Sequence, residues 1–284
     1  MYDRHVLVAT SEVRIGTAGV RSALLLERAV RGTVIVRDGL NFDTRFAAAA
    51  AGKPEPVAHV FLLLEGRFVH EGGVHAAPVA FVLADDEVER VSPKSRSFRT
   101  DGPRVVVIQL RVEKQRLEAP IGLVNGPIVV TAWDAARALV ASPTSPGALA
   151  ALLAALGNVL APIAIVEEEP ERMRRFWSTI EPLYAQYGAT MSIKQIANAL
   201  GLSLRQIGRD AKELSSTFGL GDGYRDALLV LRLRMAALLL SARDGTVAEV
   251  ARLVGYGSPI AMARAFRDAK LPAPSVVAAA LQGE

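Results

Sequence analysis

Histidine, cysteine and carboxylate side chains carry out most catalytic and metal chemistry in proteins, and this chain has few of them in useful spacing. It has no cysteine and four histidines, at positions 5, 59, 70 and 75. No two of these form a His-x-His pair. One metal site is conceivable, from His59, His70 and Glu71, but a structural role for His59 is the favoured interpretation. We therefore predict no metal and no cofactor.

Other catalytic motifs are also missing from the sequence. The chain contains no nucleophile elbow, no glycine loop that would hold a phosphate and no HExxH sequence. The acidic trio at 85–87 could bind a cation, but a solvated turn is the favoured interpretation. The serine-rich, basic segment at 92–99 could meet an anion, and a loop explains it equally well. No catalytic residue is assigned, and we predict that the protein is not an enzyme.

One seven-residue pattern occurs twice in the last third of the chain. Residues 196–202 read IANALGL and residues 250–256 read VARLVGY, which share the order apolar-Ala-x-x-apolar-Gly-apolar. A small alanine lets a second helix cross closely, and a glycine ends the first helix where a positive φ is needed. Ser203 and Ser258 then cap the second helices. The pattern predicts two helix-turn-helix units.

The residues around the two repeats support this prediction. Ser192 and Thr246 are placed to cap the first helices, and Ile207 and Met262 each follow a capping serine by four residues and should face the core. Between the repeats lies an apolar segment, 224–241, which as a helix would be about 27 Å long. Such a rod could hold two recognition helices near one DNA turn, about 34 Å, apart.

The second helix of such a unit enters the major groove of DNA, so its polar face supplies the predicted contacts. Arginine pairs with guanine and glutamine with adenine through two parallel hydrogen bonds, whereas phosphate contacts set the register. The predicted base readers are Arg205, Gln206, Arg209 and Arg264. The predicted phosphate contacts are Ser203, Lys212, Ser258 and Arg267, and the apolar Ile260 and Ala261 would read thymine methyl groups or DNA shape. The alternative is a solvated helix face.

Charge and composition agree with this assignment. Residues 190–284 hold 12 Lys and Arg against 8 Asp and Glu, and the rest of the 284 residues holds 21 of each. A basic excess is expected where a protein meets phosphate. The start of the chain does not resemble a signal peptide, and Gly157, Asn158 and Pro162 interrupt the apolar run at 148–166. We expect a cytoplasmic protein without a membrane partner.

The rest of the chain divides into a β part and a helical part. Residues 14–118 contain short apolar runs between Gly, Pro and Asp, and the segment 63–73 looks like a hairpin with its turn at Gly66. Helical periodicity follows at 131–140, 145–156 and 167–187. The expected strand segments are 34–36, 59–64, 67–70, 79–83 and 105–112.

Residues 190–275 resemble the AraC/XylS family of bacterial transcription regulators. The sequence RLRMAALLL at 232–240 is similar to the family's central linker helix, and Gly255-Tyr256 followed by ARAFR at 263–267 is similar to its second recognition segment. LPAP at 271–274 resembles its tail. The sequence departs from the family at Asp210 and Ala211, where large apolar residues are usual, and this suggests loose packing of the first unit.

The resemblance implies an α+β protein in three parts. A cupin-like β-barrel at 1–125 would bind an effector or dimerise, helices at 126–188 would supply a dimer contact, and an all-α double helix-turn-helix at 189–284 would bind DNA. The implied function is a sequence-specific regulator that acts as a homodimer on double-stranded promoter DNA under control of a small-molecule effector, with RNA polymerase as a further partner. The alternatives are a cupin-type enzyme with a helical appendage and a protein-interaction module with degenerate helix-turn-helix units.

Overall fold

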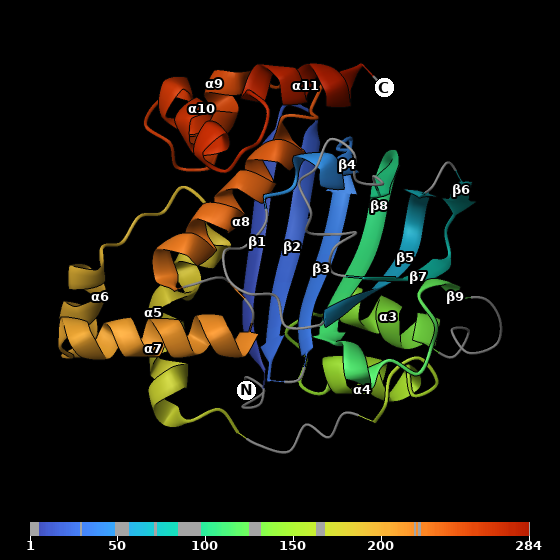
Figure 1. Cartoon of the computed structure of the whole chain (residues 1–284), viewed down its shortest axis with the longest axis horizontal. Helices are drawn as coiled ribbons and strands as arrows, with labels where there is room; N and C mark the ends of the chain where they lie inside the picture. Colours follow the sequence, from blue (N-terminus) through green and yellow to red (C-terminus); the bar gives the residue numbers. More distant parts are fainter. Residues whose placement is uncertain are drawn as a thin grey trace.

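A single antiparallel sheet forms the centre of the molecule (Figure 1). The structure is a computed structural model and describes residues 6–28, 30–48, 57–70, 73–84, 98–124, 132–162, 168–218, 220 and 223–283. In these ranges the sheet has nine strands in the order β1-β2-β3-β8-β5-β7-β9, with β4 paired to β8 and β6 to β5. The strands are β1 (Leu7–Ile15), β2 (Ala18–Glu27), β3 (Val30–Asp38), β4 (Phe42–Asp43), β5 (Val57–His70), β6 (Gly73–Ala76), β7 (Val79–Ala84), β8 (Phe98–Glu113) and β9 (Gly122–Val124).

Helices follow the strands along the chain, which confirms the predicted α+β class. The helical segments expected in the middle of the chain are present as α3, α4 and α5. The helix bounds are α3 (Ala132–Ala141), α4 (Ala148–Ala155), α5 (Glu171–Ala185), α6 (Ile193–Leu200), α7 (Leu204–Phe218), α8 (Tyr224–Leu239), α9 (Val247–Leu253), α10 (Pro259–Asp268) and α11 (Pro274–Gln282). Two short 3-10 helices lie at Thr44–Phe46 and Lys114–Arg116.

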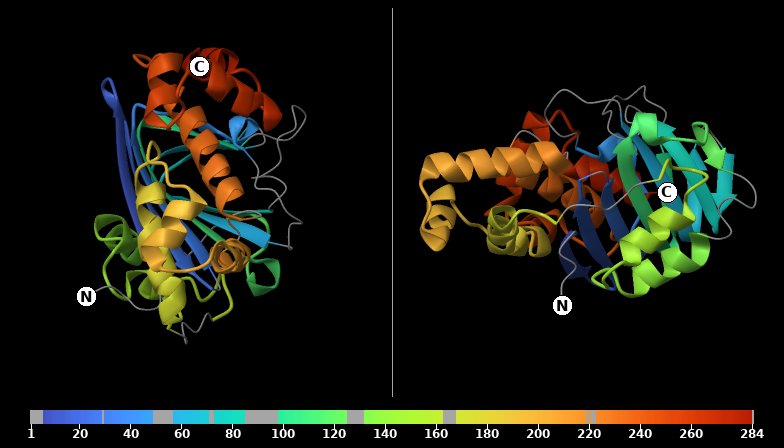
Figure 2. Two further views of the ribbon diagram at one scale, coloured as in Figure 1. Left: turned by 90° about the vertical axis from the view of Figure 1, so that its left-hand side faces the viewer. Right: turned by 90° about the horizontal axis from the view of Figure 1, so that it is seen from below.

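The two faces of the sheet carry different helices because neighbouring residues of a strand point to opposite sides. Ala23 and Leu25 of β2 form a buried cluster with α3 and α4. On the other face, Leu26 packs with α5, α6 and α7. Val20, nearer the other end of the same strand, packs with α8 and the last three helices. The sheet therefore separates α3 and α4 from α5 and α8 (Figure 2).

Two expectations about the strands are wrong. The β part begins at Leu7 rather than at residue 14, because β1 pairs along its whole length with β2. Gly66 is not a turn residue, since it lies inside β5 with a φ of +99°, and the register against β8 shifts at this point. Gly66 is therefore part of a β-bulge. The chain reverses further on, where His70 pairs with Gly73.

The division into parts at 1–125, 126–188 and 189–284 stays a prediction. The buried clusters cross its boundaries, since Ile15 and Phe46 from the sheet region share one cluster with Leu239 of α8 and Phe266 of α10. The last third of the chain is thus packed directly against the sheet.

Candidate nucleic-acid interface

The first repeat forms a helical hairpin from α6 and α7. The Ser192 hydroxyl accepts a hydrogen bond from the backbone N–H of Gln195, whose side chain accepts one from the N–H of Ser192. Gly201 ends α6 in the left-handed region with a φ of +65°. Ala197 and Ile207 are both buried in the cluster that joins the two helices. The predicted caps, crossing alanine and core residue of this unit are confirmed.

The second repeat forms the same arrangement from α9 and α10. Thr246 and Ser258 each accept a hydrogen bond from the backbone N–H three residues later, so both helices are capped as predicted. Gly255 lies between them with a φ of +82°. Ala251 and Met262 are buried together in the second cluster. Both repeats are therefore built in the same way.

One helix connects the two units and contributes to both cores. Tyr224 and Ala227, near the start of α8, belong to the cluster of the first unit. Leu233 and Leu239, further along, belong to the cluster of the second. In Figure 1 the α6–α7 unit lies at the lower left and the α9–α10 unit at the upper left, with α8 running between them. Both units are thus packed against the same helix.

The predicted contact residues lie on the outer faces of α7 and α10, and none of them is buried. Gln206 and Ser258 are half-buried, and the side chain of Ile260 is among the most exposed, with a relative exposure of 74%. The exposed members are Ser203, Arg205, Arg209, Lys212, Ile260, Ala261, Arg264 and Arg267. These residues are accessible to a duplex, and their contacts with DNA stay a prediction.

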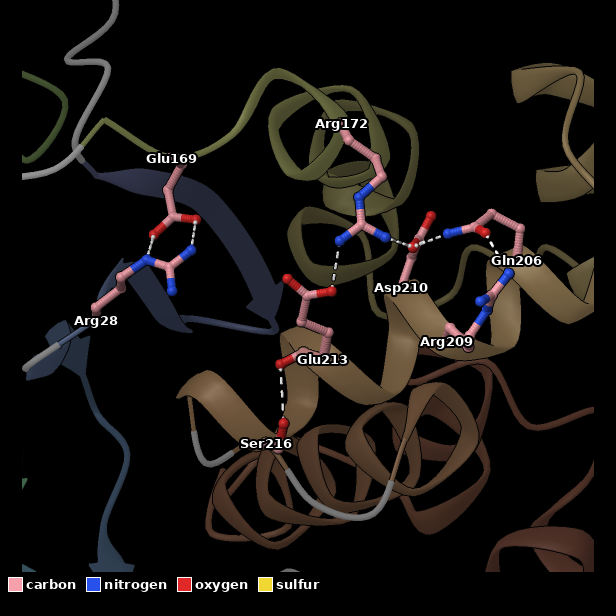
Figure 3. A network of polar contacts seen from close by, with 8 residues as sticks. All are labelled: Arg28, Glu169, Arg172, Gln206, Arg209, Asp210, Glu213 and Ser216. Atoms are coloured by element: carbon pink, nitrogen blue, oxygen red, sulfur yellow. Dashed lines mark hydrogen bonds and ion pairs between the residues drawn. The ribbon is translucent and has the colours of Figure 1, made fainter.

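A network of polar contacts joins α7 to α5 (Figure 3). Arg172 of α5 forms ion pairs with Asp210, which is fully buried, and with Glu213 at 2.5 Å. The hydrogen bond to Glu213 is the largest cause of a raised pKa at Arg172. The Asp210 carboxylate also accepts from Nε2 of Gln206 at 2.7 Å, and Oε1 of Gln206 accepts from Nη2 of Arg209 at 2.7 Å.

This network corrects the expectation of loose packing at Asp210 and Ala211. Ala211 is buried, and Asp210 is held by an ion pair where an apolar residue would make a packing contact. Sequence reasoning missed the partner, Arg172. The available signal was an acidic residue on the apolar face of an amphipathic helix, because a buried carboxylate needs a basic or hydrogen-bonding partner.

Direct hydrogen bonds hold α8 and the second unit against the sheet region. The backbone N–H of Asn41 donates to the Ser241 hydroxyl at 2.8 Å, and Nε of Arg234 donates to the carbonyl of Ala48 at 2.7 Å. The hydroxyl of Thr17, in the turn after β1, donates to Asp244 at 3.0 Å. The helical units are therefore attached to the sheet through polar as well as apolar contacts.

A cavity of about 180 Å³ lies between the sheet and α8. Its wall is mainly apolar, with Leu24 and Ile35 from the sheet and Leu231 and Leu238 from α8. The polar members of the lining include Ser22, Arg31, Thr33, Gln109 and Arg234. A molecule in this cavity would touch the sheet and the connecting helix at the same time.

The histidines considered as metal ligands have other surroundings. His59 is buried, and its Nδ1 accepts a hydrogen bond from Nε2 of Gln109 at 2.9 Å. His70 ends β5, and Glu71 lies outside the described residues, as do the trio at 85–87 and residues 92–97. In the described part of the chain no group of three or more His, Cys, Asp and Glu residues is placed to hold a metal ion. In that same part, no helix has the length and apolar character needed to cross a membrane.

Comparison with known proteins gives similarities in solved structures alone. No family model and no curated protein matches the chain. ToxT from Vibrio cholerae O395 is 9% identical over 91% of this chain and 100% of its own, with a TM-score of 0.39. A DNA-binding transcriptional dual regulator from Escherichia coli K-12 is 18% identical over 42% of this chain and 99% of its own, with a TM-score of 0.32.

A further similar structure is the DNA-binding domain of AdpA, a global transcriptional factor, in complex with a target DNA. It is 23% identical over 38% of this chain and 94% of its own, with a TM-score of 0.33. All three neighbours have low sequence identity to this chain. With TM-scores below 0.5, none of them assigns a function to this chain.

Proposed function

We propose that the protein is a sequence-specific DNA-binding transcription regulator. The observation that carries this proposal is the pair of capped helices, α7 and α10, whose outer faces are exposed and whose two units are connected by α8. Five of the exposed contact residues are arginine or lysine. Cationic side chains on such a helix meet phosphates and base edges when it enters a major groove.

The two units would divide the work of recognition. In the first, Arg205 and Arg209 would hydrogen-bond to base edges, while Ser203 and Lys212 would contact phosphates. In the second unit, Arg264 would be the base reader, and Ser258 and Arg267 would contact DNA phosphates. Ile260 and Ala261 would lie against thymine methyl groups. Both units pack against α8. A small change in the position of α8 would therefore change the distance between α7 and α10.

The effector would bind in the cavity between the sheet and α8. A mainly apolar pocket with a few polar groups in its wall is the usual form of a small-molecule site. Leu231 and Leu238 of α8 line the cavity, so such a molecule would contact α8 directly. An effector controls binding only if it has different affinities for two positions of α8. Homodimerisation through 126–188, contact with RNA polymerase and a cytoplasmic location complete the proposal.

Selection of bound sequences from a random DNA pool with the full chain tests the proposal. We expect recovery of a specific site and a steep fall in affinity with salt, because phosphate contacts release counterions. If no DNA sequence is enriched, or if the affinity for DNA does not change with salt concentration, the protein-interaction alternative is favoured.

Two substitutions of Ser258 sharpen this test. Ser258→Asp keeps an oxygen that can cap α10 but adds a negative charge where a phosphate is proposed to lie, so it should fold normally and bind DNA poorly. Ser258→Ala removes the cap and should cost about 1 kcal/mol of stability. Equal DNA affinity of the Ser258→Asp variant and the parent would contradict a groove-facing α10.

A further inference from the structure

Both ends of the Gln206 side-chain amide make hydrogen bonds within the protein. Its Nε2 donates to the buried carboxylate of Asp210, and its Oε1 accepts from Nη2 of Arg209, both at 2.7 Å. Reading adenine requires the oxygen and the nitrogen of one amide to face the base together. Here the two ends of the amide face two protein groups, as Figure 3 shows.

Arg209 has the opposite character. It is exposed, and one of its five N–H groups is used by Gln206. The remaining N–H groups are enough for the two parallel bonds that an arginine makes to O6 and N7 of guanine. An arginine that is already held also loses less conformational freedom when it binds.

The contacts continue from Arg209 to a helix outside the helix-turn-helix unit. Asp210 is fully buried, and its charge is paired with Arg172 of α5. Arg172 also holds Glu213, one turn further along α7, at 2.5 Å. Arg172, Asp210, Gln206 and Arg209 therefore form one hydrogen-bonded chain that runs from α5 to the exposed face of α7.

We propose that Arg209 reads a guanine and that Gln206, Asp210 and Arg172 are positioning residues that hold its guanidinium in place. Gln206 is then not an adenine reader, and the base preference of the first unit depends on a residue of α5. This inference rests on the proposed DNA-binding function and adds to it the division of roles among these four side chains.

The test compares the base preferences of full-length variants at every position of the selected DNA site. Arg209→Ala should lose a guanine preference of roughly tenfold at one base pair. Gln206→Ala and Arg172→Gln should lose a large part of the same preference at the same base pair. Arg175→Gln removes an equal charge from an exposed position of α5 and is the matched control, which should keep the parental preference.

Arg172→Lys separates positioning from folding. Lysine keeps the charge that Asp210 needs but lacks the planar fork that reaches Asp210 and Glu213 together. We expect it to fold and to recover part of the guanine preference that Arg172→Gln loses. The slope of affinity against salt should stay that of the parent in both variants, because no phosphate contact is removed.

Three results would overturn the inference. One is loss of an adenine preference at a different base pair in Gln206→Ala, since the glutamine would then read a base itself. Another is an unchanged preference in folded Arg172→Gln. The third is an unchanged preference in Arg209→Ala. If the parent protein selects no DNA site at all, the proposed function fails as well, so the two failures are distinguishable.

Discussion

Arg28, in the turn between β2 and β3, holds the buried carboxylate of Glu169 just before α5. Nη2 of Arg28 donates to one carboxylate oxygen at 3.1 Å, and its Nε lies 2.9 Å from the other (Figure 3). The N–H of the Trp177 indole, on α5, donates to the carbonyl of Val8 on the edge strand β1. α5 is thus attached to the sheet at its start and middle, and through Arg172 to α7.

Removing Arg28 should destabilise the protein. Arg28→Gln leaves the carboxylate of Glu169 buried without its cation, and because the arginine itself is 41% exposed we expect a loss of about 2 kcal/mol. Denaturant unfolding measures this loss. Arg137→Gln breaks an exposed ion pair with Asp134 and should change stability by less than about 0.5 kcal/mol. If Arg28→Gln lowers the free energy of unfolding as little as Arg137→Gln does, the Arg28–Glu169 ion pair does not have the stabilising role described.

Gly255 and Gly201 have similar backbones and different surroundings. A Cβ on Gly255 would lie 2.8 Å from the carbonyl oxygen of Tyr187, whereas one on Gly201 would meet nothing within 4 Å. Gly201→Ala should cost about 1 kcal/mol for its positive φ alone. Gly255→Ala should cost about 1–3 kcal/mol more, because the chain after α5 must move away. Equal losses in thermal unfolding would show that this close approach is absent.

Arg37 is a buried cation, and only some of its N–H groups have hydrogen-bond partners in the described part of the chain. Its Nη2 donates to the hydroxyl of Thr100, and in the described part of the chain its Nε and Nη1 have no hydrogen-bond partner. Burial lowers its pKa to about 9, against the attraction of Asp101. Arg37→Met should therefore raise the free energy of unfolding near neutral pH by about 1–3 kcal/mol.

The effect of Arg37→Met should depend on pH. The lowered pKa means that the unfolded chain binds this proton more tightly than the folded protein does. The cost of the buried charge is complete below pH 9 and shrinks as the pH rises through the folded pKa. The difference in the free energy of unfolding between Arg37→Met and the parent, measured by denaturant unfolding, should be smaller at about pH 10 than at neutral pH. A variant that is less stable than the parent at neutral pH would refute this view of Arg37.

Local signals were enough to predict the helical units. Ser203 and Ser258 are recognisable as caps because a cap bonds to a backbone N–H only three residues away. Gly201 and Gly255 are recognisable because a left-handed backbone at a helix end favours glycine. The periodicity of the apolar residues then shows which face of each helix is buried.

Contacts between distant segments were not predictable in this way. Arg28 and Glu169 are 141 positions apart, and Arg172 and Asp210 are 38 apart, so no spacing rule connects them. The sequence predicts a turn at Gly66 because a glycine between apolar runs fits a turn and a bulge equally well. The different roles proposed for Gln206 and Arg209 depend on the contact between Arg172 and Asp210, which the sequence alone does not reveal.

Ile260 provides a test of how the second unit would read DNA. It lies in the first turn of α10 with 74% of its surface exposed, so Ile260→Ala should leave the stability unchanged to within about 0.5 kcal/mol. Its apolar surface would be buried if a thymine methyl group lies against it in the major groove. The variant should then bind the selected site more weakly by about 1 kcal/mol.

Uracil in place of single thymines identifies the partner of Ile260, because it removes the methyl group and keeps the hydrogen-bonding edge. At the contacted position this change should weaken binding by the parent and have little effect on Ile260→Ala. Changes at other thymines should affect both proteins equally, which makes them the control. If every uracil substitution has the same effect on both proteins, Ile260 does not contact a thymine methyl group and its exposure needs another explanation.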